Sequence, residues 1–170
     1  MKTTIGWSLL VAAASGIFAF TIDAASTRVE DGVDFPEGYR SWTHISSAVI
    51  QSGASGPGMH HIYANARALE GYRTGNFPNG SIIVFDRFAL DVTTARTKAG
   101  ARQFVNLMVK DSARFRTTGG WGYDGFTGDS RTQHLFPQSR AVTSCFNCHA
   151  QRKDSNFVFT SFTDANRATR

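Results

Sequence analysis

The sequence predicts an α+β protein that is mainly β, built on an antiparallel sheet of about five strands with a few short helices. Three observations lead to this prediction. β-branched and aromatic residues recur in short alternating runs, turn residues separate these runs, and the helix-forming stretches are brief. Hydrophobic residues make up 41% of the chain and charged residues 18%, as in ordinary globular proteins. We therefore expect a single domain over residues 26–170.

Residues 1–25 are expected to be a secretory signal peptide and not part of the domain. Lys2 precedes the apolar run 5–20, and small residues stand at 24–26. We expect cleavage near Ala25, with an uncleaved membrane anchor as the alternative, because small residues do not fill both positions of an A-x-A signal. No later stretch approaches the roughly 20 apolar residues that span a bilayer. The mature protein is thus predicted to be periplasmic and free of the membrane.

Five runs of residues are predicted to be strands. The strongest is 81–92, which follows the turn signal F-P-N-G and places Ile83 and Phe85 on one face. The other four runs are 44–51, 60–63, 103–109 and 157–162. Their order along the chain favours a meander of strands over a helix bundle.

Three short segments are predicted to be helices. Residues 64–72 are rich in helix formers and stop near Gly75, and 111–117 could be capped by Asp111 or Ser112 and ended by a Gly-Gly pair. The third segment is 140–151. A Gly/Ser-rich loop is expected at 52–58.

Both cysteines of the chain lie in this third helix, in the string Cys145-Phe146-Asn147-Cys148-His149. Thiols at i and i+3 share a helical face, where they can form thioethers with the two vinyl groups of a haem, and His149 can reach the iron from the same side. A disulfide or a thioredoxin-like redox pair is the alternative. A thioredoxin-like pair would open a helix after an early strand, whereas this motif lies near the C-terminus. The sequence thus predicts one covalently attached haem c whose iron is bound by His149.

The sixth position of that iron is predicted to be open. The mature chain has only Met59 and Met108, and neither follows the motif as the methionine ligand of small helical electron-transfer cytochromes does. A ligand from the pair His60-His61 is the alternative. Neighbours on a strand point to opposite faces, and we predict that His60 is the one on the haem side.

The chain carries a formal charge of +5, which the loss of residues 1–25 leaves unchanged because one lysine and one aspartate go with them. The basic residues are scattered, so no nucleic-acid partner is predicted. The excess could hold haem propionates or favour an acidic redox partner. Arg87 and Lys110 could pair with propionates, although solvated surface positions are our preferred interpretation for both.

Several strings, in this order and spacing, resemble the cytochrome P-460 and cytochrome c′-beta family of exported mono-haem proteins. They are YRSW at 39–42, HHIY at 60–63, GYRTGNFPNG at 71–80, VKDSARF at 109–115, GWG at 120–122 and the motif at 145–149. The resemblance covers most of the expected mature chain. It implies an antiparallel β fold with a few helices, a homodimer and a five-coordinate haem.

The same resemblance separates two kinds of chemistry. In the hydroxylamine-oxidising members, a lysine is bonded to the porphyrin edge and a carboxylate lies near the open iron face. Phe85 stands at the place of the lysine and Asn106 at that of the carboxylate. An amide cannot serve as the general base that removes protons from hydroxylamine. These departures favour the branch in which phenylalanines cap the iron, with Phe85, His60 and Asn106 lining the pocket. The alternatives are ordinary sheet core for Phe85, a hydrogen-bonded surface or core histidine for His60 and a satisfied buried amide for Asn106.

The predicted function is therefore the binding of small gases such as NO or CO at an exported c-type haem. One alternative is a haem oxidoreductase that oxidises hydroxylamine or NO, and a second is a periplasmic electron-transfer cytochrome with a protein redox partner. The sequence leaves open whether the protein is an enzyme, and it identifies no catalytic residue.

Overall fold

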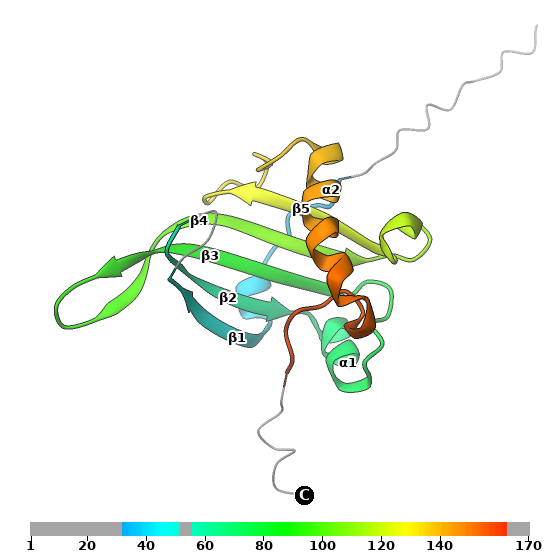
Figure 1. Ribbon diagram of the computed structural model, residues 1–170, viewed down its shortest axis with the longest axis horizontal. Coiled ribbons are helices and arrows are strands. Elements are labelled where there is room, and N and C mark those ends of the chain that lie inside the picture. The colour runs from blue at the N-terminus through cyan, green and yellow to red at the C-terminus, as the bar shows by residue number, and fades with distance from the viewer. Residues whose placement is uncertain (1–31, 52–55, 163–170) are drawn as a thin grey trace, which may run out of the picture.

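The computed structural model describes residues 32–51 and 56–162, and there the chain forms one five-stranded sheet with short helices (Figure 1). The expected signal peptide at 1–25 lies outside the described residues. Every pair of neighbouring strands is antiparallel, and the strand order follows the chain. The strands are β1 (Thr43–Ile50), β2 (Gly58–Ala64), β3 (Ile82–Val92), β4 (Thr97–Lys110) and β5 (Trp121–Thr127). The predicted mainly-β antiparallel fold is confirmed.

β3 is the central strand, and its register determines which side chains meet across the sheet. Phe85 pairs with Ile62 on β2 and with Asn106 on β4. Side chains that are paired in this way point to the same face, and successive residues on a strand point to opposite faces. Phe85 and Arg87 therefore share one face of the sheet, and Asp86 between them points to the other.

Two α-helices accompany the sheet. α1 (Ala66–Thr74) begins where the Asn65 side chain accepts a hydrogen bond from the Ala68 amide at 2.9 Å, and it ends at Gly75, which has a φ of 77°. α2 (Gln138–His149) continues into the short 3-10 helix η3 (Ala150–Ser155). Two further 3-10 turns are η1 (Tyr39–Ser41) and η2 (Arg116–Thr118). Across 32–51 and 56–162, no helix is long and apolar enough to cross a membrane.

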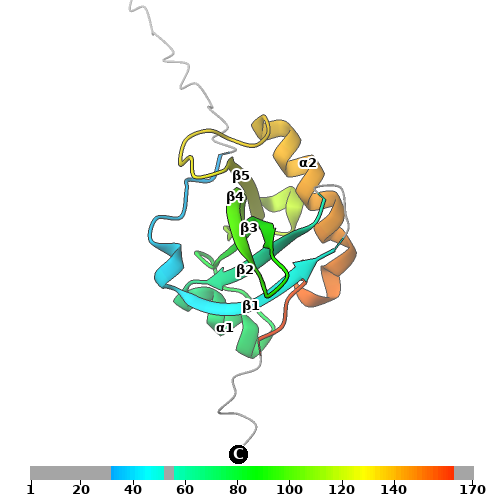
Figure 2. The same ribbon diagram turned by 90° about the vertical axis from the view of Figure 1, so that its left-hand side faces the viewer.

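Each face of the sheet is covered by a different part of the chain, as Figures 1 and 2 show. α2 and the segment after it lie over one face, and the segment before β1 lies over the other. Two groups of buried apolar residues result. Trp121, Tyr123 and Met108 belong to the core beneath α2, whereas Tyr39 and Val84 belong to the core on the opposite side.

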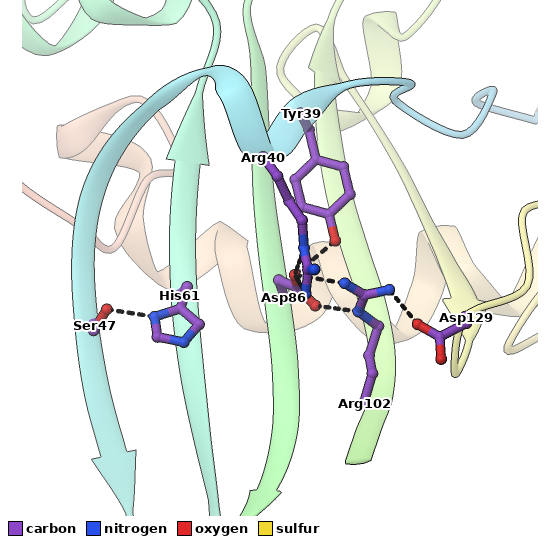
Figure 3. A network of polar contacts seen from close by, with 7 residues as sticks. All are labelled: Tyr39, Arg40, Ser47, His61, Asp86, Arg102 and Asp129. Carbon is purple, nitrogen blue, oxygen red and sulfur yellow. Dashed lines mark hydrogen bonds and ion pairs between the residues drawn. The ribbon is translucent and has the colours of Figure 1, made fainter. Parts of the chain in front are cut away.

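A buried carboxylate anchors β3 on the face away from α2 (Figure 3). Asp86 is 0% exposed; its carboxylate accepts hydrogen bonds from the Tyr39 hydroxyl at 2.6 Å and from Arg102 Nε at 2.8 Å. Arg40 Nε donates to it at 3.3 Å. Arg102 also bonds Asp129. Because a buried charge needs partners of this kind, the network holds β3 against η1 and β4.

One predicted strand is wrong and one real strand was not predicted. Residues 157–162 form no strand; Asn156 and Phe157 have positive φ values of 54° and 65°, which interrupts any extended run. β5 occupies the fifth place in the sheet instead. Its glycines interrupt the alternating pattern that predicts a strand. They allow close packing, since a Cβ on Gly122 would lie 2.3 Å from the Phe115 ring.

The predicted helix at 111–117 is also wrong, although its expected cap and its expected end are present. The Asp111 side chain accepts hydrogen bonds from the amides of Ala113 and Arg114, and Gly119 ends η2 with a φ of 67°. Between them Phe115 leaves the helical region with a ψ of 48°. A segment this short has little helical stability of its own, and burial of Phe115 determines its path instead.

Candidate functional site

A cavity of about 560 Å³ lies between the sheet and α2. Strands β2 to β5 provide one wall, and the end of α2 with the segment 158–160 provides the other. Its size is within the range of about 300–1,000 Å³ that is usual for ligand and cofactor pockets. All six residues that the sequence singled out line it, namely Cys145, Cys148, His149, Phe85, His60 and Asn106.

The sheet wall of the cavity carries three aromatic rings from three adjacent strands. The rings of His60 and Phe85 are stacked with their centroids 4.6 Å apart. Phe85 and Phe104 are also nearly parallel, with centroids 6.1 Å apart. The alternation of β2, β3 and β4 points all three rings to the same side. They form a largely apolar row of stacked rings across the sheet wall.

Three buried polar atoms at this cavity have no hydrogen-bond partner within the described residues. They are His60 Nδ1, Asn106 Oδ1 and the Tyr123 hydroxyl. Burial, followed by the positive charges of Arg87 and His61, lowers the pKa of His60 and favours its neutral ring. Because nearly all buried polar groups in native proteins are paired, three orphans around one cavity indicate that a bound group belongs there.

Cys145, Cys148 and His149 come from the last turn of α2 and face the cavity together. Both cysteines are unpaired. Burial, with smaller effects from Asp124 and Cys148, raises the pKa of the Cys145 thiol to about 11. A thioredoxin-like cysteine has a lowered pKa at a helix N-terminus, so this environment does not fit a reactive redox pair. The environment of Cys145 suits a thiol that forms a stable covalent bond.

The ring of His149 is held in one orientation and one tautomer. Its Nδ1 donates a hydrogen bond to the Phe157 carbonyl at 2.6 Å, which leaves Nε2 unprotonated. The rings of Tyr123 and Phe159 lie 5.1 and 5.0 Å from it, centroid to centroid. Burial lowers the pKa of His149, although the carbonyl opposes this in part. A neutral imidazole whose second nitrogen is held by a carbonyl is typical of metal-binding histidines.

The carbonyl that holds His149 depends on two residues in a rarely populated conformation. Asn156 and Phe157 both have positive φ, which is uncommon outside glycine. The Asn156 carbonyl accepts a hydrogen bond from Trp121 Nε1 at 3.0 Å, and the Asn156 side chain donates to the Gly75 carbonyl. Trp121, which is part of the core beneath α2, therefore also fixes the segment that orients His149.

Replacing Gly119 with alanine is expected to destabilise the protein by about 1–3 kcal/mol more than the same change at Gly38. Both glycines have almost the same positive φ, 67° and 68°. A Cβ on Gly119, however, would lie 2.2 Å from the Phe157 ring, whereas a Cβ on Gly38 meets nothing within 4 Å. Urea unfolding of the two variants measures the difference, and equal losses would show that contact with Phe157 is unimportant.

The structure corrects the interpretation of two basic residues as solvated surface charges. Arg87 is 3% exposed and lines the cavity, and Lys110 is 8% exposed. Lys110 is directed elsewhere, since its Nζ donates to the Gly119 carbonyl at 2.7 Å and lies over the Trp121 ring. The alternation of β3 that places Phe85 in the site also places Arg87 there, so the sequence contained a signal for it.

Two further wall residues, Tyr123 and Phe159, were also missed. Tyr123 belongs to β5, which was not predicted, and Phe159 belongs to the segment wrongly predicted as a strand. Each side chain contacts the His149 ring. No separate motif marks either residue in the sequence.

The cavity fits the haem that the sequence predicts. Two thiols and a neutral imidazole nitrogen stand on one wall, and a largely apolar row of three aromatic rings stands on the other. The three unpartnered polar atoms would be available to hydrogen-bond a group bound in the cavity. Cys145 and Cys148 would hold the porphyrin, and His149 would bind the iron.

A family model described as Cytochrome P460 matches residues 36–160. The matched range contains all five strands, both α-helices and the C-x-x-C-H motif. No curated protein matches the chain.

Proposed function

This chain belongs to the cytochrome P460 family and is a haem protein, and on that premise we propose that it binds small gases such as NO or CO at a single, covalently attached, five-coordinate haem c. The observation that carries the proposal is the composition of the cavity wall. Among the described residues that line it, none is an aspartate or glutamate, and Phe85 lies between the rings of His60 and Phe104. Such a wall admits uncharged diatomic molecules and provides no carboxylate base.

Each wall residue has a definite task in this proposal. The thiols of Cys145 and Cys148 would hold the porphyrin through thioethers, and Nε2 of His149 would bind the iron, because Nδ1 is already bonded to the Phe157 carbonyl. Phe85 and Phe104 would exclude water from the sheet wall of the cavity. His60 and Asn106 present polar atoms that can hydrogen-bond a bound ligand. When bound, haem iron supplies a coordination position for the gas.

One feature favours a second function, the oxidation of hydroxylamine or NO. His60 Nδ1 is buried without a partner in the described part of the chain, and its lowered pKa keeps the ring neutral at pH 7. A neutral imidazole can accept a proton, which hydroxylamine oxidation requires of a base. This function would place on His60 the role that a carboxylate has in the enzymes that the sequence resembles.

The optical spectrum of the reduced protein, with and without CO, tests the proposed function. We expect a five-coordinate, high-spin ferrous haem whose Soret band shifts when CO binds. A six-coordinate, low-spin spectrum without CO binding would contradict gas binding and support electron transfer. The His60→Leu variant is the control for a histidine ligand, because it would convert such a spectrum to the five-coordinate form. Steady-state turnover of hydroxylamine with an electron acceptor would support the second function.

We also propose that the protein acts in the periplasm as a homodimer. The proposal of export rests on the signal sequence at 1–25, and that of a dimer on the family resemblance. Cell fractionation and light scattering of the purified holoprotein test them. For oxidoreduction or electron transfer the protein would also need a redox partner.

A further inference from the structure

We propose that Arg87 is the anion-binding residue of the cavity and that its ligand is a carboxylate of the haem, one of the two propionates. The inference rests on the haem of the proposed function, but not on which gas or substrate that haem takes. It assigns a task to a buried cation that neither the C-x-x-C-H motif nor gas binding requires.

Arg87 is buried, and no acidic residue in the described part of the chain pairs with it. The residue is 3% exposed and lines the cavity. Its Nε donates to Gln103 Oε1 at 2.8 Å and one Nη donates to the Gly56 carbonyl, so both of its acceptors are neutral. None of the ion pairs within residues 32–51 and 56–162 includes Arg87. A buried guanidinium without a counter-charge is strongly unfavourable, which indicates that an anion completes the site.

The neighbouring carboxylate, that of Asp86, already has partners of its own. Asp86 precedes Arg87 on β3 but points to the opposite face of the sheet, where it is fully buried. Arg102 and Arg40 both pair with it, and Tyr39 donates a further hydrogen bond (Figure 3). Asp86 therefore cannot neutralise Arg87 through a direct contact.

The other described residues that line the cavity provide no counter-charge for Arg87. The other titratable groups that face it are His60 on β2, Tyr123 on β5, and Cys145, Cys148 and His149 on α2. None of these described groups is a carboxylic acid, so none of them gives Arg87 a carboxylate counter-charge. The guanidinium of Arg87 is thus the one fixed charge among the described wall residues. A haem with two propionates supplies charge of the opposite sign.

The position of Arg87 relative to the cysteines also favours a propionate as its ligand. The vinyl and propionate groups of haem lie on opposite edges of the porphyrin, so thioethers to the end of α2 direct the propionates away from that helix. α2 packs on β5, and β4 separates β5 from β3. Ile83 on β3 lies in the same cross-strand row of paired residues as Tyr123 on β5, and Tyr123 contacts His149. Arg87 lies four residues further along β3. Its planar guanidinium suits a carboxylate.

The test is a redox titration of the intact holoprotein over a range of pH, with Arg87→Gln compared with wild type. A cation within about 4–6 Å lowers the pKa of a carboxylate by about 1–3 units. Its loss should therefore raise the proton affinity of the propionate at least tenfold, and the pH range over which the reduction potential varies should move up by at least about one unit. Arg96→Gln is the matched control, because Arg96 is an exposed arginine in the β3–β4 hairpin. It removes the same charge and should leave this pH range unchanged.

A parallel titration of the ferric protein with nitrite and with azide distinguishes a propionate from an external anion. If Arg87→Gln weakens binding of these anions but leaves the pH range of the potential unchanged, the propionate assignment is overturned. An unchanged pH range together with unchanged anion binding also overturns it. Failure of the wild-type protein to bind CO would contradict the proposed function and leave the redox result for Arg87 standing.

Arg87→Lys provides a second route if Arg87→Gln does not incorporate haem. Lysine keeps the charge but loses the planar pair of donors. We expect the propionate bending band in the resonance Raman spectrum to shift in this variant while the haem remains bound. An unchanged band would overturn the assignment.

Discussion

Replacing both Cys145 and Cys148 with alanine is expected to abolish covalent attachment of haem. Both thiols face the cavity from the last turn of α2, and they are the only cysteines in the chain. Without them no side chain can form a thioether with a vinyl group. Haem staining after denaturing electrophoresis measures the effect directly, and we expect the stained band to be lost in the double variant.

Two single variants and a control variant within the motif separate the contributions of the two thiols. Cys145→Ala and Cys148→Ala each leave one thiol, so each should retain at most one thioether, visible as a shifted absorption band of the pyridine haemochrome. Asn147→Ala changes an exposed residue between the two cysteines and preserves the motif. It should stain as wild type does. A stained band of normal strength from the double variant would contradict covalent attachment through these thiols.

Replacing Asp86 with alanine is expected to lower the free energy of unfolding by about 3–5 kcal/mol. The substitution leaves Arg102 and Arg40 without their shared carboxylate, and it removes the acceptor of the buried Tyr39 hydroxyl. The Arg102 side chain, which is 12% exposed, then keeps only its pairing with the exposed Asp129, and breaking a buried pair by removing one partner is strongly destabilising. Urea unfolding followed by circular dichroism measures the loss.

Asp91→Ala is the matched control, because it removes the same residue type from the same strand. The side chain of Asp91 is 45% exposed, and that of its partner Lys98 is 54% exposed. Exposed pairs of this kind contribute about 0–1 kcal/mol. Equal losses for the two variants would show that burial of the Asp86 network does not stabilise the fold.

Much of the fold could be predicted from sequence because most strands show a clear alternation. The run 81–92 was expected as a strand, and the structure has β3 at Ile82–Val92. β5 could not be found in this way, because Gly122 and Gly125 interrupt its pattern. A side chain at Gly125 would lie 2.4 Å from Asn106 Oδ1, so this glycine marks close packing and not a turn.

The candidate site was predictable in parts, for different physical reasons. Cys145, Cys148 and His149 follow from the chemistry of their spacing on a helix, whereas Phe85 and Asn106 came from the family resemblance. Their meeting at one cavity depends on long-range strand register, which a single sequence does not reveal. Arg87 was assigned to solvent because charged residues are mostly exposed, and its burial at the cavity wall reverses that expectation.

The order of the elements along the chain also has a consequence for how the protein folds. The sheet is a meander, so each strand pairs with its immediate neighbour in sequence, and all of its strands precede α2. Local pairing of this kind closes short loops and favours rapid formation. The sheet wall of the cavity is thus expected to form first, and docking of α2 with the segment that holds His149 then becomes the last step, the one that haem attachment would make irreversible.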